Sequence, residues 1–469
     1  MTNLILSADS YKASHFLQYP QGTEVVNAYI EARGGAFPVA LFFGLQAFVK
    51  QYLLQRVTAA DIEEAAEVLA AHGEPFNRAG WQHIVDVHGG YLPLEIEALP
   101  EGSVTPLRNA VVQLRNTDPD CGWLTSYVET ALLRAVWYPS TVATLSWHAK
   151  QIIRRYLEAT GSAVGLEYRL HDFGARGASS DESAALGGLA HLVNFRGTDT
   201  LAAVIAGRRW YNTPMAGTSI PAAEHSTITA WGRAMELDAY ENMLDQFARP
   251  GSVLACVSDS YDLWAAIDLW GQKLKSKLEA SGATLVVRPD SGNPLEVVPA
   301  ALERLMTHFG YRTNELGYRV LPDHVRLIQG DGVDLASIEA ILDACRARAL
   351  SAANLSFGMG GALLQRVHRD TMQWAMKISA AQVAGQWREV YKSPVTDPGK
   401  RSKRGRLAVV PDLACMVTTV SVEDLRGRQN LLRPVFRNGE LLIEENMATV
   451  RTRADAGLAW VHPAGEPGV

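Results

Sequence analysis

The stretch ATLVVRPDSGNP, residues 283–294, decides the fold class because an apolar run ends abruptly in polar residues. Short runs that are rich in β-branched residues and bounded by Gly, Pro and Asp are typical of buried strands. This run stops at Arg288 and Asp290, and two prolines and a glycine interrupt or follow them. The stretch therefore predicts a buried strand whose C-terminal end carries an arginine and an aspartate.

The same pattern occurs four more times along the chain. Apolar runs end in polar or glycine-rich clusters in EYRLHDFGARG, LACVSDSYD, VRLIQGDGVD and NLSFGMGG. The last four of the five clusters follow one another at intervals that suit single βα units of about 30 residues. Amphipathic stretches at 260–282, 293–310 and 334–350 predict the intervening helices.

Repeated strand–loop–helix units predict an α/β fold with a parallel sheet, either closed as a barrel or open and doubly wound. In both cases the carboxyl ends of the strands face one cavity, so Arg288 and Asp290 lie where such folds place their chemistry. Residues 1–145 read as a helix-rich α+β layer. After about Lys377, alternating apolar residues flank a Pro/Gly/Lys/Arg-rich loop, which predicts antiparallel strands on an outer domain.

Composition indicates an ordinary soluble globular protein of 469 residues, 47% hydrophobic and 20% charged. The net charge of -6 argues against a general nucleic-acid binder. No apolar segment reaches the roughly 20 residues of a membrane-spanning helix, and we expect no secretory signal. The cysteines 121, 256, 345 and 415 stand far apart, which indicates reduced thiols and predicts a cytoplasmic protein.

Several motifs admit both a structural and a ligand-binding interpretation. The glycine loop of FGMGGALLQRVHRD, residues 357–370, suits either a tight turn or a phosphate site, with Arg369 expected about two turns into the following helix. Asp331 in QGDGVD is either a turn residue or a partner for ribose hydroxyls. In HDFGARG, Phe173 is either a core residue or a surface for a flat ring, and Arg176 is either a surface residue or a group that steers an anionic substrate.

Asp199, Glu224 and His225 form a second group of candidates. A histidine beside a glutamate suggests acid–base chemistry or a phosphate-accepting imidazole, although a lone histidine is more often structural. The spacing excludes HExxH, so no metal held by protein ligands is predicted. The basic loop 392–406 reads as a solvated loop or as a lid over a polyphosphate, and no GxxxxGK[ST] motif occurs.

Beyond these patterns, the chain closely resembles the nicotinamide phosphoribosyltransferases, within the nicotinate phosphoribosyltransferase-like (type II) family. The resemblance rests on DSYKASH, HDFGARGASS, HLVNFRGTDT, PAAEHSTITAWG, VSDSYD, RPDSGNPLE, IQGDGVD, GGALLQ and DPGKRSKRGRL, in the family's order from residue 9 to about 407. It implies an irregular, TIM-like βα-barrel over 146–377, with a discontinuous outer α/β domain from 1–145 and 378–469. It also implies a homodimer with shared active sites.

The resemblance further implies a reaction of nicotinamide with phosphoribosyl pyrophosphate, Mg²⁺ carried by the pyrophosphate, and ATP hydrolysis coupled through a phosphohistidine. The implied substrate contacts are Tyr11 (from the partner chain), Phe173, Arg176, Asp199, Ser219, Arg288, Gly330, Asp331, Gly360, Gly361 and Arg369. The implied catalytic group is Glu224, His225, Asp259 and Asp290, and the implied pyrophosphate or ATP contacts are Arg33 (from the partner chain), Lys377, Lys392 and Lys400.

The implied role of Asp199 bears on substrate choice, because a carboxylate accepts from an amide but repels the carboxylate of nicotinate. Three departures from the family pattern leave relative affinities open: Ala175, Met359 and a short segment after Arg33. The alternatives are a nicotinate phosphoribosyltransferase and a non-catalytic nucleotide-binding protein on the same scaffold.

Overall fold

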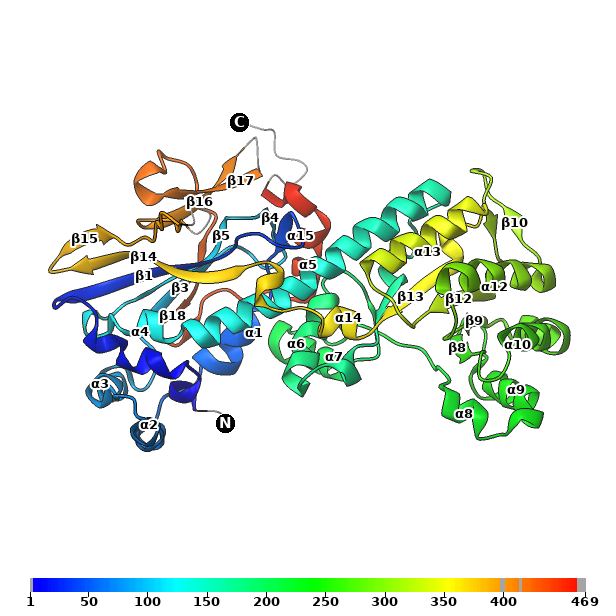
Figure 1. Cartoon of the computed structure of the whole chain (residues 1–469), viewed down its shortest axis with the longest axis horizontal. Helices are drawn as coiled ribbons and strands as arrows, with labels where there is room; N and C mark the ends of the chain where they lie inside the picture. Colours follow the sequence, from blue (N-terminus) through cyan, green and yellow to red (C-terminus); the bar gives the residue numbers. More distant parts are fainter. Residues whose placement is uncertain (1–2, 397–400, 413–415, 462–469) are drawn as a thin grey trace. The chain divides into compact units, whose positions relative to one another are not determined.

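A computed structural model describes residues 3–396, 401–412 and 416–461 (Figure 1). The chain divides into two compact units. Unit 1 contains residues 1–144, 206–214 and 367–469, and unit 2 contains residues 145–205 and 215–366. The domain boundaries expected from the sequence stay a prediction, because compactness alone does not establish domains that fold independently.

Unit 2 is built on a parallel sheet of six strands in the order β7-β6-β13-β12-β9-β8. All five strands expected from the apolar runs are confirmed. The strands are β6 (Leu170–Asp172), β7 (Gly197–Thr198), β8 (Val253–Val257), β9 (Thr284–Arg288), β12 (Val325–Gln329) and β13 (Leu355–Met359). Their apolar residues form a continuous core because a parallel sheet is covered on both faces, and Leu254, Leu285 and Leu327 are fully buried.

The two edge strands of this sheet are both contacted by one short segment, residues 218–223. Thr218 bridges Gly197 of β7, and Ala222 bridges Ala255 of β8, both in parallel orientation. The backbone N–H of Thr218 donates to Arg196 O at 2.8 Å, and that of Ala223 donates to Ala255 O at 3.0 Å. Both edge strands of the sheet therefore bond to a further backbone segment on their outer side.

The helices expected between the strands are confirmed, with caps that explain their ends. α12 (Pro294–Phe309) begins after Asn293, whose side chain accepts from the Leu295 N–H, and α13 (Leu335–Ala347) begins with a capping box at Asp334. Unit 2 also contains α6 (Asp181–His191), α8 (His225–Thr229), α9 (Glu236–Phe247), α14 (Gly361–Leu364) and the hairpin β10 (Arg312–Thr313)–β11 (Arg319–Val320).

The helical stretch 263–281 contains a π turn that the sequence pattern does not predict. It consists of α10 (Leu263–Leu269), the π-helical η8 (Trp270–Leu274) and α11 (Lys275–Ser281), and it ends at Gly282 with φ of 66°. Trp270 at the start of the π turn is fully buried. Its indole Nε1–H donates to Ser258 Oγ at 3.2 Å, and Ser258 is the residue that precedes Asp259 in the chain.

Unit 1 is built on an antiparallel sheet whose strands come from both ends of the chain, as Figure 1 shows for the neighbouring β1 and β14. The expected antiparallel strands after residue 377 are confirmed. In sheet order the strands are β15 (Gln386–Glu389), β14 (Trp374–Val383), β1 (Thr23–Ala32), β5 (Ala110–Asn116), β3 (Leu94–Ala98), β18 (Arg433–Arg437) and β19 (Glu440–Leu441).

Smaller elements complete unit 1. Two further strand pairs are β2 (Val39–Leu41) with β4 (Val104–Pro106) and β16 (Leu407–Asp412) with β17 (Met416–Ser421). The helices include the 3-10 helix η2 (Ser10–Leu17), α1 (Leu45–Phe48), the π-helical η3 (Val49–Leu53), α2 (Ala59–His72), α3 (Arg78–His88), α4 (Leu124–Tyr127) and α15 (Met447–Asp455). Two helices contribute residues to both units: α5 (Glu129–Thr160) and α7 (Leu201–Tyr211).

Two expectations from composition concern helices and cysteines. In the described part of the chain, no helix is both long and apolar enough to cross a membrane. Cys121, Cys256 and Cys345 are buried free thiols, and Cys415 lies outside the described residues.

Candidate functional site

The carboxyl end of β9 places Arg288 and Asp290 beside each other. The Arg288 guanidinium donates from Nε and Nη2 to Asp290 Oδ1 at 3.1 and 2.8 Å. Both side chains are partly accessible, with 21% and 18% of their surface exposed. The arginine is therefore oriented by a carboxylate while it keeps donors for a ligand.

Asp259, two residues after β8, contacts two of the other predicted residues. Its Oδ1 lies 3.1 Å from His225 Nε2, and its Oδ2 accepts from the Asp290 backbone N–H at 3.1 Å. His225 Nδ1 lies 4.0 Å from Asp290 Oδ2. The Asp259 side chain is 3% exposed whereas that of His225 is 47% exposed, so a buried carboxylate orients an accessible imidazole.

Glu224 and His225 lie at the start of α8. Glu224 is the N-cap residue of this helix; its carboxylate accepts from the Ser226 hydroxyl, and its backbone N–H donates to Thr227 Oγ1 at 3.2 Å. The glutamate therefore shapes the turn that presents His225. The side chains of these two described residues bond to different partners, so the expected support of the His225 imidazole by the Glu224 carboxylate stays a prediction.

Phe173, just after β6, lies over the ends of the central strands. It packs against the buried residues Ala255, Val286 and Ile328. A Cβ built at Gly358 of β13 would lie 2.0 Å from the Phe173 ring, and one built at Gly330 would lie 3.4 Å from it and 3.5 Å from Arg288 Nε. The loops after β6, β9, β12 and β13 therefore meet at one place, as the sequence predicted.

Asp199, just after β7, is exposed and is tied to its neighbours by two hydrogen bonds. Its Oδ1 accepts from Ser219 Oγ at 2.5 Å, and its backbone N–H donates to Asp172 O at 3.0 Å. Burial raises the pKa of Asp172, while hydrogen bonds from threonine hydroxyls and the Gly174 N–H oppose that rise. Asp172 therefore fixes the backbone that carries both Phe173 and Asp199.

The glycine loop after β13 lies against the loop after β6. A Cβ at Gly360 would lie 3.5 Å from Phe173 O, and one at Gly177 would lie 3.5 Å from Gly361 Cα. Asp331 is exposed on the turn after β12, where its carbonyl accepts from Gln329 Nε2 at 2.9 Å. Arg176 and Ala175 are exposed after β6, and Met359 is buried.

The expected position of Arg369 was wrong in one respect. α14 ends at Leu364, and Arg369 lies in a separate 3-10 turn, Arg369–Thr371, which belongs to unit 1. The helical pattern stops at this point, since the Gln365 N–H still makes the usual bond to Gly361 O but the Arg366 N–H bonds the same oxygen and not that of Ala362. The guanidinium of Arg369 donates to Trp374 O at 3.3 Å and pairs with Asp370.

Unit 1 gathers a second group of predicted residues. Burial lowers the pKa of Lys377, and the positive charges of Arg33, Lys12 and Arg369 lower it further against the opposing effect of Glu129. These cations are therefore close enough to repel one another, which suits an anionic ligand. Tyr11 is 54% exposed, and its ring lies 5.3 Å from Lys12 Nζ.

Lys392 and Lys400 belong to the basic loop. Lys392 is exposed, and its backbone N–H donates to Ser402 Oγ at 2.9 Å. Lys400 lies outside the described residues.

Three residues of the site were missed by the sequence analysis. Gly358 makes room for Phe173, and a glycine inside a strand is a known sign of close approach. Asp172 was noted only as a neighbour of Phe173, although an aspartate at a strand end is a typical anchor for a turn. Lys12 gave no signal apart from its place beside Tyr11.

Chemically, the residues of unit 2 offer an aromatic surface, an oriented arginine, several carboxylates and glycine-lined backbone. That set can bind a flat ring, ribose hydroxyls and a phosphate. No described side chain of this set is an activated serine or cysteine nucleophile. The imidazole of His225 is the group best placed to accept a phosphoryl group or a proton.

Comparison with known proteins gives matches over nearly the whole chain. The model of the nicotinate phosphoribosyltransferase (NAPRTase) family matches residues 168–440, and that of the nicotinamide phosphoribosyltransferase N-terminal domain matches residues 3–96. A nicotinamide phosphoribosyltransferase of Xanthomonas campestris pv. campestris (strain 8004) is 53% identical over 97% of this chain and 99% of the relative. One of Acinetobacter baylyi is 33% identical over 96% and 97%.

Solved structures share the fold at low sequence identity. The nicotinate-nucleotide pyrophosphorylase of Pyrococcus furiosus superposes with a TM-score of 0.62 at 16% identity, over 98% of this chain and 96% of the other. The human nicotinic acid phosphoribosyltransferase gives a TM-score of 0.56 at 19% identity, over 96% and 93%. These likenesses concern the mixed α/β fold alone.

We predict that Gly358→Ala destabilises the chain, because the added methyl group would overlap the Phe173 ring. Overpacking of this kind costs about 1–3 kcal/mol, so the urea unfolding midpoint should fall. Gly361→Ala is the matched control, since a Cβ there meets no heavy atom within 4 Å. Equal midpoints for the two variants would contradict the proposed close approach.

Proposed function

We propose that this chain, which belongs to the nicotinate phosphoribosyltransferase family and within it to the nicotinamide phosphoribosyltransferases, transfers the phosphoribosyl group of phosphoribosyl pyrophosphate to nicotinamide. The products are nicotinamide mononucleotide and pyrophosphate, which is a step of NAD salvage. The observation that carries the proposal is the meeting of Phe173, Arg288 and Gly330 at the strand ends.

The pyridine ring would lie on Phe173, with its amide between two polar partners. The Arg288 guanidinium would donate to the amide carbonyl, and the Asp199 carboxylate would accept from the amide NH₂. Asp199 already accepts from the Ser219 hydroxyl, which supports an oriented carboxylate. A nicotinate carboxylate at this place would face like charge, so the proposal includes selectivity for the amide.

The sugar phosphate would lie along the neighbouring loops. Asp290, Gly330 and Asp331 would contact the ribose hydroxyls, and Gly360 and Gly361 would approach the 5′-phosphate closely because they carry no side chain. Arg369 would bind the same 5′-phosphate. Arg33 of the partner chain, Lys377, Lys392 and Lys400 would neutralise the pyrophosphate or ATP phosphates, with Mg²⁺ arriving on the substrate. The mutual repulsion around Lys377 supports an anion-binding role.

The proposed reaction needs no protein nucleophile. The ring nitrogen of nicotinamide attacks ribose C1 as pyrophosphate departs through an oxocarbenium-like state. Positioning by Phe173, Arg288 and Asp199 and neutralisation of the leaving group supply the catalysis.

ATP coupling through His225 is a separate part of the proposal. When Asp259 accepts a hydrogen bond from Nε2, the neutral imidazole has its free lone pair on Nδ1. An attack of that nitrogen on the γ-phosphorus of ATP, with ADP leaving, would give a phosphohistidine. Glu224 would act through the turn that it caps, and hydrolysis of the phosphohistidine would make synthesis more favourable.

The proposal extends to assembly, fold and compartment. Tyr11 would come from the partner chain of a homodimer and stack on the far face of the ring, which gives its exposed side chain a role. The hydrogen bonds of residues 218–223 to both β7 and β8 support an irregular βα-barrel. Three buried free thiols support a reducing, cytoplasmic location.

The first test is formation of nicotinamide mononucleotide by the purified chain, with nicotinate as the competing substrate. We expect Asp199→Asn to lower kcat/KM for nicotinamide about 10- to 100-fold, because a hydrogen bond to a charged group contributes about 1.5–3 kcal/mol. The same variant should use nicotinate better than the parent does, since the repelling charge is gone.

Asp323→Asn is the matched control for this change, because its side chain is 94% exposed. Faster use of nicotinate by the parent chain would replace the proposal with a nicotinate phosphoribosyltransferase. Binding of phosphoribosyl pyrophosphate without turnover would indicate a non-catalytic nucleotide-binding protein.

For ATP coupling, His225→Ala should abolish both ATP hydrolysis and the stimulation by ATP, yet leave slow ATP-independent synthesis. Intact-protein mass spectrometry of the parent chain with ATP should show the addition of one phosphate, absent in the variant. His72→Ala, an exposed histidine of α2, is the control. A phosphate that persists in His225→Ala would assign the coupling to another residue.

Shared active sites can be tested by mixing two impaired variants, Tyr11→Ala and Asp331→Ala. Random subunit exchange should restore about a quarter of the parent activity, because half of the dimers are mixed and each mixed dimer contains one intact site. Activity that stays at the mean of the two variants, or a monomer in sedimentation, would contradict a shared site.

A further inference from the structure

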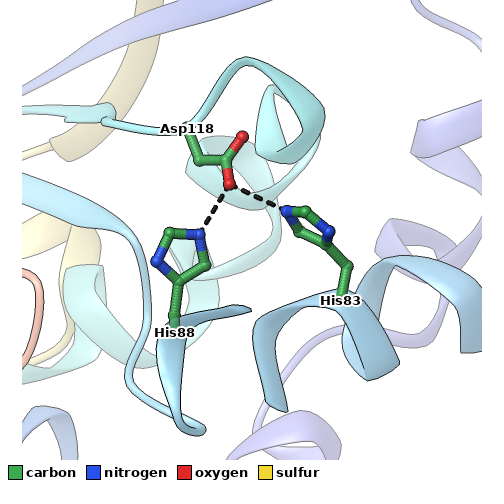
Figure 2. Close-up of side chains that lie close together, drawn as sticks. All are labelled: His83, His88 and Asp118. Atoms are coloured by element: carbon green, nitrogen blue, oxygen red, sulfur yellow. Dashed lines mark hydrogen bonds and ion pairs between the residues drawn. The ribbon is translucent and has the colours of Figure 1, made fainter. Parts of the chain in front are cut away.

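Three side chains of unit 1 outside the residues used above converge on one point. His83 Nε2 and His88 Nε2 lie 2.8 and 2.6 Å from the same oxygen, Oδ2 of Asp118 (Figure 2). The two imidazole rings are 5.7 Å apart and inclined at 71°. In the described part of the chain, this is the only group of three or more His, Cys, Asp or Glu side chains whose ligand atoms all lie within 4.8 Å of one another.

The local backbone holds the three side chains in place. His83 lies within α3, and His88 is its last residue, followed by Gly89 with φ of 61°. The second oxygen of Asp118, Oδ1, accepts from the Asp120 N–H at 2.9 Å, and Asp118 O accepts from Asn116 Nδ2 at 2.8 Å. Asp118 is therefore oriented by contacts that leave Oδ2 to the imidazoles.

We propose that His83, His88 and Asp118 form a binding site for a divalent transition-metal ion such as Zn²⁺. Two imidazoles and one carboxylate are a ligand set that Zn²⁺ uses in proteins. The oriented Asp118 Oδ1 supplies the outer contact that ligating carboxylates usually have. The site is independent of the proposed transferase function.

Only small movements are required for the ion to enter. Ligand atoms around a tetrahedral Zn²⁺ lie roughly 3.3 Å apart, since each bond is about 2.0–2.1 Å, so the rings must move outward by about half an ångström. The side chains are 28%, 22% and 14% exposed, so solvent can deliver the ion and occupy its remaining position. Binding would replace the two Nε2 protons that now bond Asp118.

A bound ion would tie the end of α3 to the turn that follows β5. With three protein ligands and an open position, the site would exchange its ion more readily than a closed four-ligand site. We therefore expect binding that raises the thermal unfolding temperature and that a chelator reverses.

The test uses the full chain without an affinity tag, freed of metal with a chelator and titrated with Zn²⁺ alone by isothermal calorimetry. We expect one equivalent to bind. His83→Gln and His88→Gln should each weaken that binding about 100-fold or more, because even outer partners of a metal site contribute roughly 10- to 100-fold. Co²⁺ in place of Zn²⁺ should give visible absorption bands that both variants lose.

His72→Gln is the matched control and should bind Zn²⁺ as the parent does, because His72 is exposed and lies outside the cluster. Circular dichroism of the metal-free variants checks that each is folded. If a histidine variant is not folded, Asp118→Asn replaces it in the binding test. No binding by the parent, or one equivalent retained in all three cluster variants, would overturn the proposal and leave a hydrogen-bonded clamp.

Discussion

The two oxygens of the Asp259 carboxylate hold the centre of the candidate site together. One oxygen faces the His225 imidazole, and the other accepts from the backbone of Asp290, so the loops after two adjacent strands share one buried carboxylate. The carboxylate fixes its partners, because a buried polar group that loses a hydrogen bond is costly. The orientation of Arg288 depends on the same arrangement, since its own partner is Asp290.

The aromatic surface of the site depends on an absence of side chains. Phe173 can lie across β13 only because position 358 is a glycine, whereas a Cβ at position 330 would make an ordinary contact with the ring. The ring therefore rests directly on backbone, next to an arginine that a carboxylate orients. The end of β6 therefore positions two residues of the candidate site, because Phe173 follows Asp172 directly and the Asp199 N–H donates to Asp172 O.

Much of this arrangement follows from the sequence, because strands and helices are local. Apolar runs with polar ends identified β6, β8, β9, β12 and β13, and helical periodicity identified α12 and α13. Contacts between distant residues were beyond such reasoning. Nothing in the pattern around residue 358 specifies that Phe173 lies over it, and nothing in the segment 218–223 indicates that it bonds two edge strands.

The short length of α14 shows a different limit. The sequence predicted Arg369 about two turns into this helix, yet α14 ends at Leu364, where the Arg366 N–H bonds back to Gly361 O. Likewise, the ligand set of His83, His88 and Asp118 has no recognisable spacing, because the aspartate comes 30 residues after the second histidine. Tertiary structure alone brings these groups together.

The π turn at Trp270–Leu274 has a consequence for how this chain tolerates change in length. A π turn is an α-helix with one residue inserted, so the helical faces on its two sides are out of phase. Trp270 uses that offset to stack on Tyr240, with centroids 4.8 Å apart, and to bond Ser258. Removing a single residue here would make the helix more regular, but it would turn the indole away from Ser258. A more regular helix would therefore lose a contact to the residue that precedes Asp259.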